Sequence, residues 1–310
     1  MSSHAAFRVG ARLALSTTVL MFGLIVLGSV VRTTGSGLAC PDWPLCQGRL
    51  IPPFQFNVLI EWFHRLAALL VSLLLFVTAG WVMIHPATRA RLGGLAALAV
   101  LLLLAQVLLG ALTVWKLLSP SVVSSHLAVA LLLFVSMLVL ALTAFAESRP
   151  SGPRAEARPA GLLAAFGIAT ALAFGQSLLG GVVSTSHAGL ACPDWPACQG
   201  RWFPPISTLE GIHMLHRHGG YALAAAITLV ALRSRSAPDP GVRAGGAAAL
   251  GLTLVQVALG VWNVMSGTPP WLSAVHLANA AAILAVLATT THRVARMPAR
   301  ATRVALAAST

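Results

Sequence analysis

A segment of thirteen residues occurs twice in this chain, and its two copies start 152 residues apart. Residues 37–49 read GLACPDWPLCQGR and residues 189–201 read GLACPDWPACQGR, so the copies differ only where Leu45 is replaced by Ala197. Repetition at a fixed spacing indicates that one structural unit has been duplicated. Whatever fold the chain adopts must therefore accommodate two copies of one arrangement.

The duplication extends to histidines that lie far from this segment. The paired positions, first copy and then second, are His64 and His216, Arg65 and Arg217, and His126 and His276. The first two pairs keep the spacing of 152 residues, and the third pair is separated by 150. The repeated unit therefore covers about half of the chain.

Each unit contains four long apolar spans. Because 57% of the 310 residues are hydrophobic and only 9% are charged, a water-soluble surface cannot be built from this composition. A span of about 20 apolar residues is long enough to cross a hydrocarbon core of about 30 Å as a helix. The eight spans lie near residues 10–31, 58–83, 92–115, 122–146, 161–184, 209–232, 242–265 and 271–292. We therefore predict an all-α integral membrane protein with eight transmembrane helices.

The even number of spans in each unit sets the expected symmetry. The second copy must have the same membrane orientation as the first, so we predict two tandem four-helix bundles related by a pseudo-twofold axis along the membrane normal. Residues 1–146 form the N-terminal bundle in this interpretation, and residues 161–310 form the C-terminal bundle. Residues 147–160, which are rich in Arg and Pro, form a cytoplasmic linker.

The basic residues predict the orientation of the chain. A net charge of +13 would suggest nucleic-acid binding in a soluble protein, but here most of the 20 basic residues fall between alternate spans and at both ends. Because loops rich in Lys and Arg stay in the cytoplasm, we predict that both termini are cytoplasmic. The charge is thus explained by the lipid bilayer, and nucleic acid is excluded as a partner.

The histidines His64 and His126 are each expected within about two turns of the outer end of a span, as are their counterparts His216 and His276. An ionisable group at bilayer depth costs about 2.5 to 3.5 kcal/mol, so it should face a protein interior or a ligand. Two imidazoles at similar depth on two helices of a bundle are what bis-histidine ligation of haem iron requires. Zinc is disfavoured because no further ligand lies at that depth. Single histidines in such positions can instead be hydrogen-bonded core residues.

Glu61 distinguishes the first copy from the second. It lies three residues before His64, so both side chains project from one face of a helix. The residue at the matching position of the second copy is His213. A carboxylate that can hold a proton beside only one histidine pair indicates that chemistry occurs in the first half. The alternative is an interfacial ion pair between Glu61 and Arg65, with His64 uninvolved.

Three arginines are candidate contacts for haem propionates, because a guanidinium binds carboxylates through charge-assisted hydrogen bonds. They are Arg65, Arg217 and Arg32, of which Arg32 is replaced by Ser184 in the second copy. The alternative is that the arginine side chains extend to the membrane interface.

The only cysteines form two Cys-x5-Cys pairs in the predicted outer loops, Cys40 with Cys46 and Cys192 with Cys198. The extracytoplasmic side favours disulfides, and the prolines in each loop can bring the sulfurs together. We predict two disulfides. A thiol relay that delivers electrons, or thiolate ligation of haem, remain open alternatives.

Together these features resemble the heme A synthase family, the membrane enzymes that convert haem O to haem A for terminal oxidases. The resemblance rests on the eight spans, the outer loop 36–44, the Glu61-x-x-His64-Arg65 motif and the three further histidines. It implies that His216 and His276 hold a permanent haem b and that His64 and His126 line the site for the substrate, haem O. It also implies that Glu61 is catalytic and that the Cys40 to Cys46 loop is needed for activity.

The implied reaction is the stepwise oxidation of the C8 methyl group of haem O to a formyl group, with electrons from an external donor that the sequence does not identify. The resemblance places the protein in the cell membrane and names haem O synthase and terminal oxidase assembly factors as candidate partners. Assembly into a homo-oligomer is left open.

Three other functions compete with this one. A di-haem cytochrome that takes electrons from quinol explains four histidines but not the single Glu61. A transporter with parallel repeats explains the symmetry but gives the cysteine loops no role. A membrane thiol oxidoreductase would ordinarily use a closer Cys-x-x-Cys spacing.

Overall fold

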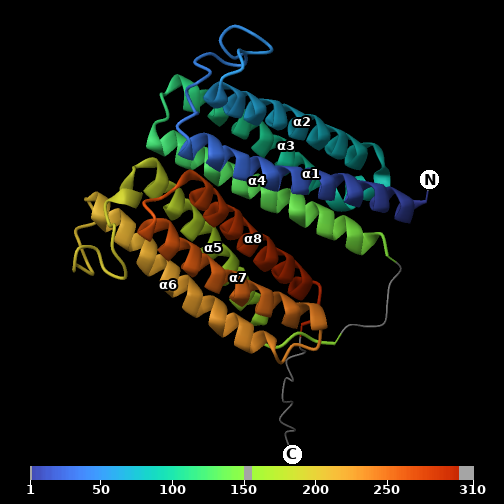
Figure 1. Ribbon diagram of the computed structural model, residues 1–310. Coiled ribbons are helices and arrows are strands. Elements are labelled where there is room, and N and C mark those ends of the chain that lie inside the picture. Colours follow the sequence, from blue (N-terminus) through green and yellow to red (C-terminus); the bar gives the residue numbers. More distant parts are fainter. Residues whose placement is uncertain (1, 150–155, 300–310) are drawn as a thin grey trace, which may run out of the picture.

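The computed structural model describes residues 2–149 and 156–299, and within them the chain forms eight long α-helices (Figure 1). They are α1 (Ser3–Thr33), α2 (Phe56–Ile84), α3 (Pro86–Trp115), α4 (Pro120–Glu147), α5 (Leu162–Thr185), α6 (Leu209–Ser234), α7 (Pro240–Met265) and α8 (Pro270–Ala295). A short 3₁₀ helix, η1 (Ala188–Leu190), follows α5, and the described residues contain no strand. Each predicted span coincides with one helix. The all-α prediction is confirmed.

Seven of the eight helices in the described residues are long and apolar enough to cross a membrane, which makes the chain a multi-pass membrane protein. The exception is α6, for which we had predicted a span like the others. Its first half, next to the loop 186–208, carries Glu210, Arg217 and the histidines 213, 216 and 218, and these lower its mean hydropathy. The most polar helix thus carries one of the paired histidines, which is expected where polar side chains face a site instead of lipid.

The starts of the helices follow local rules. Pro occupies the first turn of α3, α4, α7 and α8. A backbone N–H at that position has no hydrogen-bond partner within the helix, so proline costs nothing there. The side chains of Ser2, Thr208 and Asp239 accept hydrogen bonds from backbone N–H groups in the first turns of α1, α6 and α7. Proline and side-chain caps therefore mark the beginnings of most of the helices.

Helices of each half pack mainly against one another. In the first half α2 and α4 each contact both α1 and α3, and in the second half α6 and α8 each contact both α5 and α7. Figure 1 shows α1 to α4 lying together and α5 to α8 lying beside them. The helices that carry the paired histidines thus lie opposite each other within each half.

The contacts between the halves come from α1 and α4 on one side and α5 and α8 on the other. Several polar pairs cross this boundary, among them Ser124 with Thr185 at 3.1 Å, Thr143 with Nε2 of His292 at 3.1 Å, and Glu147 with Arg296 at 3.2 Å. In an apolar environment such hydrogen bonds between helices fix their relative position.

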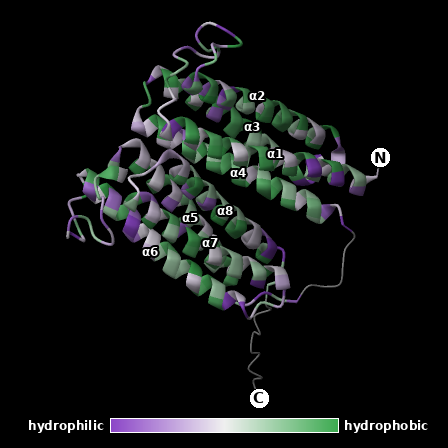
Figure 2. Ribbon diagram, in the orientation of Figure 1, coloured by the Kyte–Doolittle hydropathy of each residue, from purple (hydrophilic) through white to green (hydrophobic). Residues whose placement is uncertain are grey.

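The two long loops, residues 34–55 and 186–208, extend from the same end of the helices, opposite to the end at which α1 begins (Figure 1). Figure 2 shows apolar residues along the helices and polar residues concentrated in these loops and at helix ends. The repeated segments therefore lie on one side of the molecule, near the ends of the helices that carry the histidines.

Candidate functional site

The four paired histidines occupy equivalent places in their helices. His64 lies eight residues into α2, His126 six residues into α4, His216 seven into α6 and His276 six into α8. At a rise of 1.5 Å per residue, each lies about 9 to 12 Å from the loop end of its helix. All four side chains are partly buried. The structure thus places the histidines of each half at similar depth on opposite helices.

Each of these imidazoles lies against a glycine of the preceding helix. A Cβ atom built on the glycine would lie about 3 Å from Cε1 of the histidine, closer than ordinary contacts allow. The distances are 3.1 Å for Gly28 and His64, 3.3 Å for Gly110 and His126, 2.9 Å for Gly180 and His216, and 3.1 Å for Gly260 and His276. The absence of a side chain at these glycines therefore allows the imidazole to approach the neighbouring backbone. The sequence alone does not reveal this role, although Gly28 and Gly180 are 152 residues apart like the duplicated histidines.

Three of the four imidazoles also contact a glutamine. Gln106 donates to Nε2 of His126 (3.2 Å), Gln176 donates to Nδ1 of His216 (3.0 Å), and Gln256 donates to Nε2 of His276 (3.1 Å). The counterpart of Gln176 in the first half is Leu24. Nδ1 of His64 is buried and has no hydrogen-bond partner among the described residues. His64 is therefore the least constrained ring of the four.

The donor atoms fit haem. Nδ1 of His64, of His126 and of His276 is buried without a hydrogen-bond partner in the described part of the chain. A buried polar atom without a partner is costly and is found where a ligand or water completes a site. A pair of imidazole donors surrounded by apolar helices matches the axial ligand set of a bis-histidine haem.

Glu61 connects α2 to the first disulfide loop. Its side chain is only 5% exposed. One carboxylate oxygen accepts the backbone N–H of Cys40 at 2.8 Å, and the other accepts Nη2 of Arg65 at 2.6 Å. The ion pair that we considered as an alternative is therefore present, and the same carboxylate also anchors the loop. A catalytic role for Glu61 stays a prediction.

The arginines that follow the histidines bind the loops. Arg65 donates to the carbonyl oxygens of Cys40 (2.8 Å) and Asp42 (2.6 Å). Arg217 repeats this arrangement with the carbonyls of Cys192 (2.8 Å) and Ala197 (2.7 Å). Contacts of these guanidiniums with propionates stay a prediction, while their role in holding the loops against the helices is visible.

Two further differences between the halves have structural consequences. His213, which replaces Glu61, is buried and places Nδ1 2.9 Å from the carbonyl oxygen of Ala188. It therefore keeps a contact to its own loop without a carboxylate. Arg32 donates to the backbone carbonyl of Ser184, its own counterpart in the second copy. Arg32 thus links the two halves near the loop side, and its predicted propionate contact remains a prediction.

Both predicted disulfides, Cys40 to Cys46 and Cys192 to Cys198, are present, and residues 2–149 and 156–299 contain no free cysteine. Each closes a tight loop in which the second cysteine pairs with an arginine three residues later through backbone hydrogen bonds. The cysteine sulfurs are buried against the start of α2 or α6. The loops are therefore packed parts of the fold.

We predict that the first loop loosens in acid. The carboxylate of Asp42 accepts the N–H groups of Gly48 (2.7 Å) and Gln47 (2.6 Å). The Gly48 hydrogen bond, the Gln47 bond and the charge of Arg65 hold the pKa of Asp42 below its ordinary value. A carboxyl group whose pKa is lower in the folded than in the unfolded chain stabilises the fold at a pH above its unfolded-state pKa. This stabilisation is lost as the pH falls through the lower, folded-state pKa.

The Asp42→Asn variant tests this at constant pH. We expect amide hydrogen exchange at Gln47 and Gly48 to become about tenfold faster, because the charged acceptor is lost. Asp194→Asn should accelerate exchange at Gln199 and leave the first loop unchanged. Unaltered exchange at Gly48 in Asp42→Asn would contradict the prediction.

The fold and the site together define a multi-pass α-helical membrane protein with a matched pair of histidines on opposite helices in each half. Residues 11–57 and 53–288 match the family model COX15-CtaA, described as cytochrome oxidase assembly protein. Since the match covers most of the chain, the protein belongs to this family.

Curated relatives agree with the family model. The chain is 32% identical to heme A synthase of Paracoccus denitrificans, over 90% of this chain and 86% of the relative. It is 31% identical to heme A synthase of Caulobacter sp., over 90% of this chain and 94% of the relative. It is 29% identical to heme A synthase of Shewanella oneidensis, over 88% of this chain and 93% of the relative. The similarity therefore spans both halves.

Proposed function

We propose that this chain is a heme A synthase that oxidises the C8 methyl group of haem O to a formyl group. The relatives that it matches over about nine-tenths of its length are named for this activity. The observation that carries the proposal is the pairing of intramembrane histidines in both halves, with a buried carboxylate beside only the first pair. A di-haem cytochrome without oxidase chemistry does not require that difference.

The proposed architecture is two four-helix bundles, residues 1–146 and 161–310, related by a pseudo-twofold axis along the membrane normal and joined by the linker 147–160. The matching helix contacts within the two halves support it. The matching disulfide loops at one end of the helices support it as well.

We assign the first half to the substrate and the second to a resident cofactor. In this proposal His64 and His126 bind haem O, and His216 and His276 hold haem b, which supplies one-electron transfer when bound. In the second half a glutamine orients each imidazole, and a ring nitrogen that accepts the amide N–H would have to release it before that nitrogen could bind iron. In the first half only His126 has such a partner, so His64 is the ring that can move away during turnover.

Glu61 is the proposed catalytic group. Its carboxylate lies one helical turn from His64 and is nearly excluded from solvent, where it can hold or release a proton beside the porphyrin. Cys40 and Arg65 fix the position of both carboxylate oxygens. This arrangement gives the Cys40 to Cys46 loop a direct reason to affect activity.

The protein is proposed to lie in the cell membrane with both termini in the cytoplasm and both disulfide loops outside. Basic residues at the ends and between alternate helices support this orientation. The electron donor lies outside the chain, and haem O synthase and terminal oxidase assembly factors are the proposed partners.

The function is tested by identifying the pigment. The protein is expressed in cells that supply haem O, and the extracted haem is identified by mass. We expect formylated or hydroxylated haem, and its loss in a His64→Ala, His126→Ala double variant. Recovery of haem b alone, with the terminal oxidase lacking haem A, would instead identify a plain cytochrome.

A further inference from the structure

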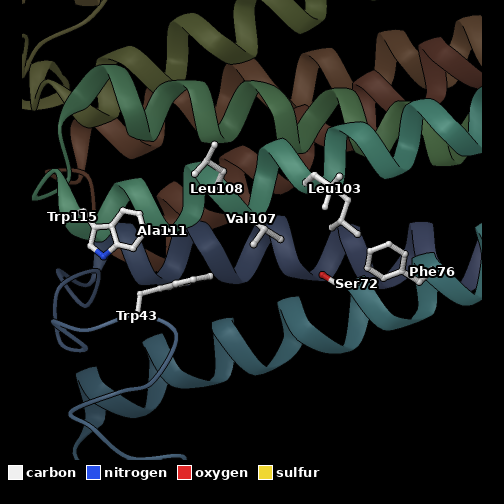
Figure 3. Close-up of a pocket in the computed structure, with 9 residues that line it drawn as sticks. Trp43, Ser72, Phe76, Leu103, Val107, Leu108, Ala111 and Trp115 are labelled. Carbon is white, nitrogen blue, oxygen red and sulfur yellow. The ribbon is translucent and has the colours of Figure 1, made fainter.

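An apolar cavity of about 380 Å³ lies between α2 and α3 (Figure 3). Ser72 and Phe76 on α2 form one wall, and six residues of α3 form the other, with Trp43 of the first disulfide loop at one end. The α3 residues are Leu103, Leu104, Val107, Leu108, Ala111 and Trp115. No charged residue lines the cavity, and the only polar atoms on its lining side chains are a serine hydroxyl and two indole nitrogens. It is therefore suited to a hydrocarbon group.

The cavity opens sideways from the bundle. Its floor is buried, since Leu103 is 4% exposed and Ala111 only 1%. Its rim includes Phe76, Leu104 and Leu108, which are about half exposed on helices that cross the membrane. A group in the cavity can thus enter from the lipid side.

The cavity and the contacts of His126 share a turn of α3. On α3, Gln106 and Gly110 contact His126. The next residue in each case, Val107 and Ala111, lines the cavity. One turn of α3 therefore contributes residues to both the histidine site and the cavity.

The outer end of the cavity is closed in a way that the second half does not reproduce. The rings of Trp43 and Trp115 meet edge to face, with centroids 6.0 Å apart. Trp43 has the counterpart Trp195, but Trp115 is replaced by Met265. The floor changes too, because Ala111 is replaced by the larger Val261 and Leu103 by Thr253. This lining is thus particular to the half that carries Glu61.

We propose that this cavity binds the isoprenoid tail of the haem O molecule held at His64 and His126. The inference rests on the proposed function and adds a subsite to it. The tail is the apolar group that distinguishes haem O from haem b, and the volume is within the range of small-ligand pockets, about 300 to 1,000 Å³. Because lipid is as apolar as the cavity, the benefit comes from close packing and from fixing the porphyrin in one orientation.

The proposal is tested with haem b and haem O, which differ in the tail. The full-length protein in lipid nanodiscs, carrying His216→Ala to remove the second site, is titrated with each haem and followed by its Soret absorbance. We expect haem O to bind more tightly than haem b. Val107 points toward α2 in Figure 3, so Val107→Trp should fill the cavity and reduce this preference by about tenfold.

Val257→Trp is the matched control, since Val257 is the counterpart of Val107 in the second half. It should leave the preference unchanged, and haem b should bind Val107→Trp as well as it binds the parent. An equal affinity of the parent for the two haems, or a preference that survives Val107→Trp, overturns the tail site and identifies the cavity as a lipid contact. Failure of both haems to bind at His64 and His126 would instead contradict the proposed function.

Discussion

Glu61→Gln is expected to reduce haem A formation by about 10²- to 10⁴-fold, while both haem sites stay loaded. Glutamine keeps nearly the shape of glutamate and can still accept the N–H of Cys40, so the loop should remain in place. It cannot hold or release a proton at neutral pH. The loss should therefore appear in the rate of product formation, measured by extraction and mass, and not in the bound haem measured by its absorbance.

The contact between Glu61 and Arg65 offers a competing explanation, which Arg65→Gln separates from the first. Arg65 donates to loop carbonyls that Glu61 does not touch, so removing it should loosen the loop more than Glu61→Gln does. If the carboxylate takes part in the reaction, Glu61→Gln should lose activity while the backbone amides of its first disulfide loop stay protected from hydrogen exchange. Equal loop loosening in both variants, or loss of first-half haem from Glu61→Gln, would show that Glu61 is structural. His213→Gln should leave the first-half chemistry intact.

The helices and disulfides could be predicted because their determinants are local. A run of about 20 apolar residues next to a proline or a capping side chain is sufficient to indicate a membrane helix and where it starts. The chain has four cysteines, and the two of each pair lie six residues apart in one loop, so few other pairings are open to them. The observed helices accordingly lie where the spans were expected, and both disulfides are formed.

The contacts of the arginines could not be predicted in the same way. Arg65 and Arg217 donate to carbonyl groups of the loops, contacts that the sequence pattern does not indicate, while their propionate contacts stay a prediction. The loop contacts depend on how the loop folds back over the helix end, which no periodicity records. The bond from Arg32 to the carbonyl of Ser184 depends on the packing of one half on the other.

The glycines beside the histidines are duplicated in the sequence, but the sequence does not show that they contact imidazoles. Gly28 and Gly180 occur at the same spacing as the duplicated histidines, as do Gly23 and Gly175. The sequence cannot say which pair faces an imidazole, because that depends on the rotation of one helix against the next. The structure distinguishes them: a Cβ atom at Gly23 or Gly175 would meet nothing within 4 Å.

This difference predicts the effects of four substitutions. Gly180→Val should displace the imidazole of His216, since even the Cβ atom would lie 2.9 Å from Cε1. Overpacking of this kind costs about 1 to 3 kcal/mol, so haem affinity in the second half should fall by about ten- to a hundredfold. Gly28→Val should do the same at His64 in the first half. The absorbance of bound haem, measured with the other half intact, reports each loss.

Gly175→Val and Gly23→Val are the matched controls, five residues away on the same helices. They add the same side chain to α5 and α1 in open space, so any general effect of valine on helix insertion or stability appears in them as well. Selective loss of second-half haem in Gly180→Val, equal to that in His216→Ala, would show that the histidine works only when its ring lies against the bare backbone of α5. Unchanged haem in Gly180→Val would mean that the ring binds iron from another position, and the assignment of His216 as a ligand in this geometry would be wrong.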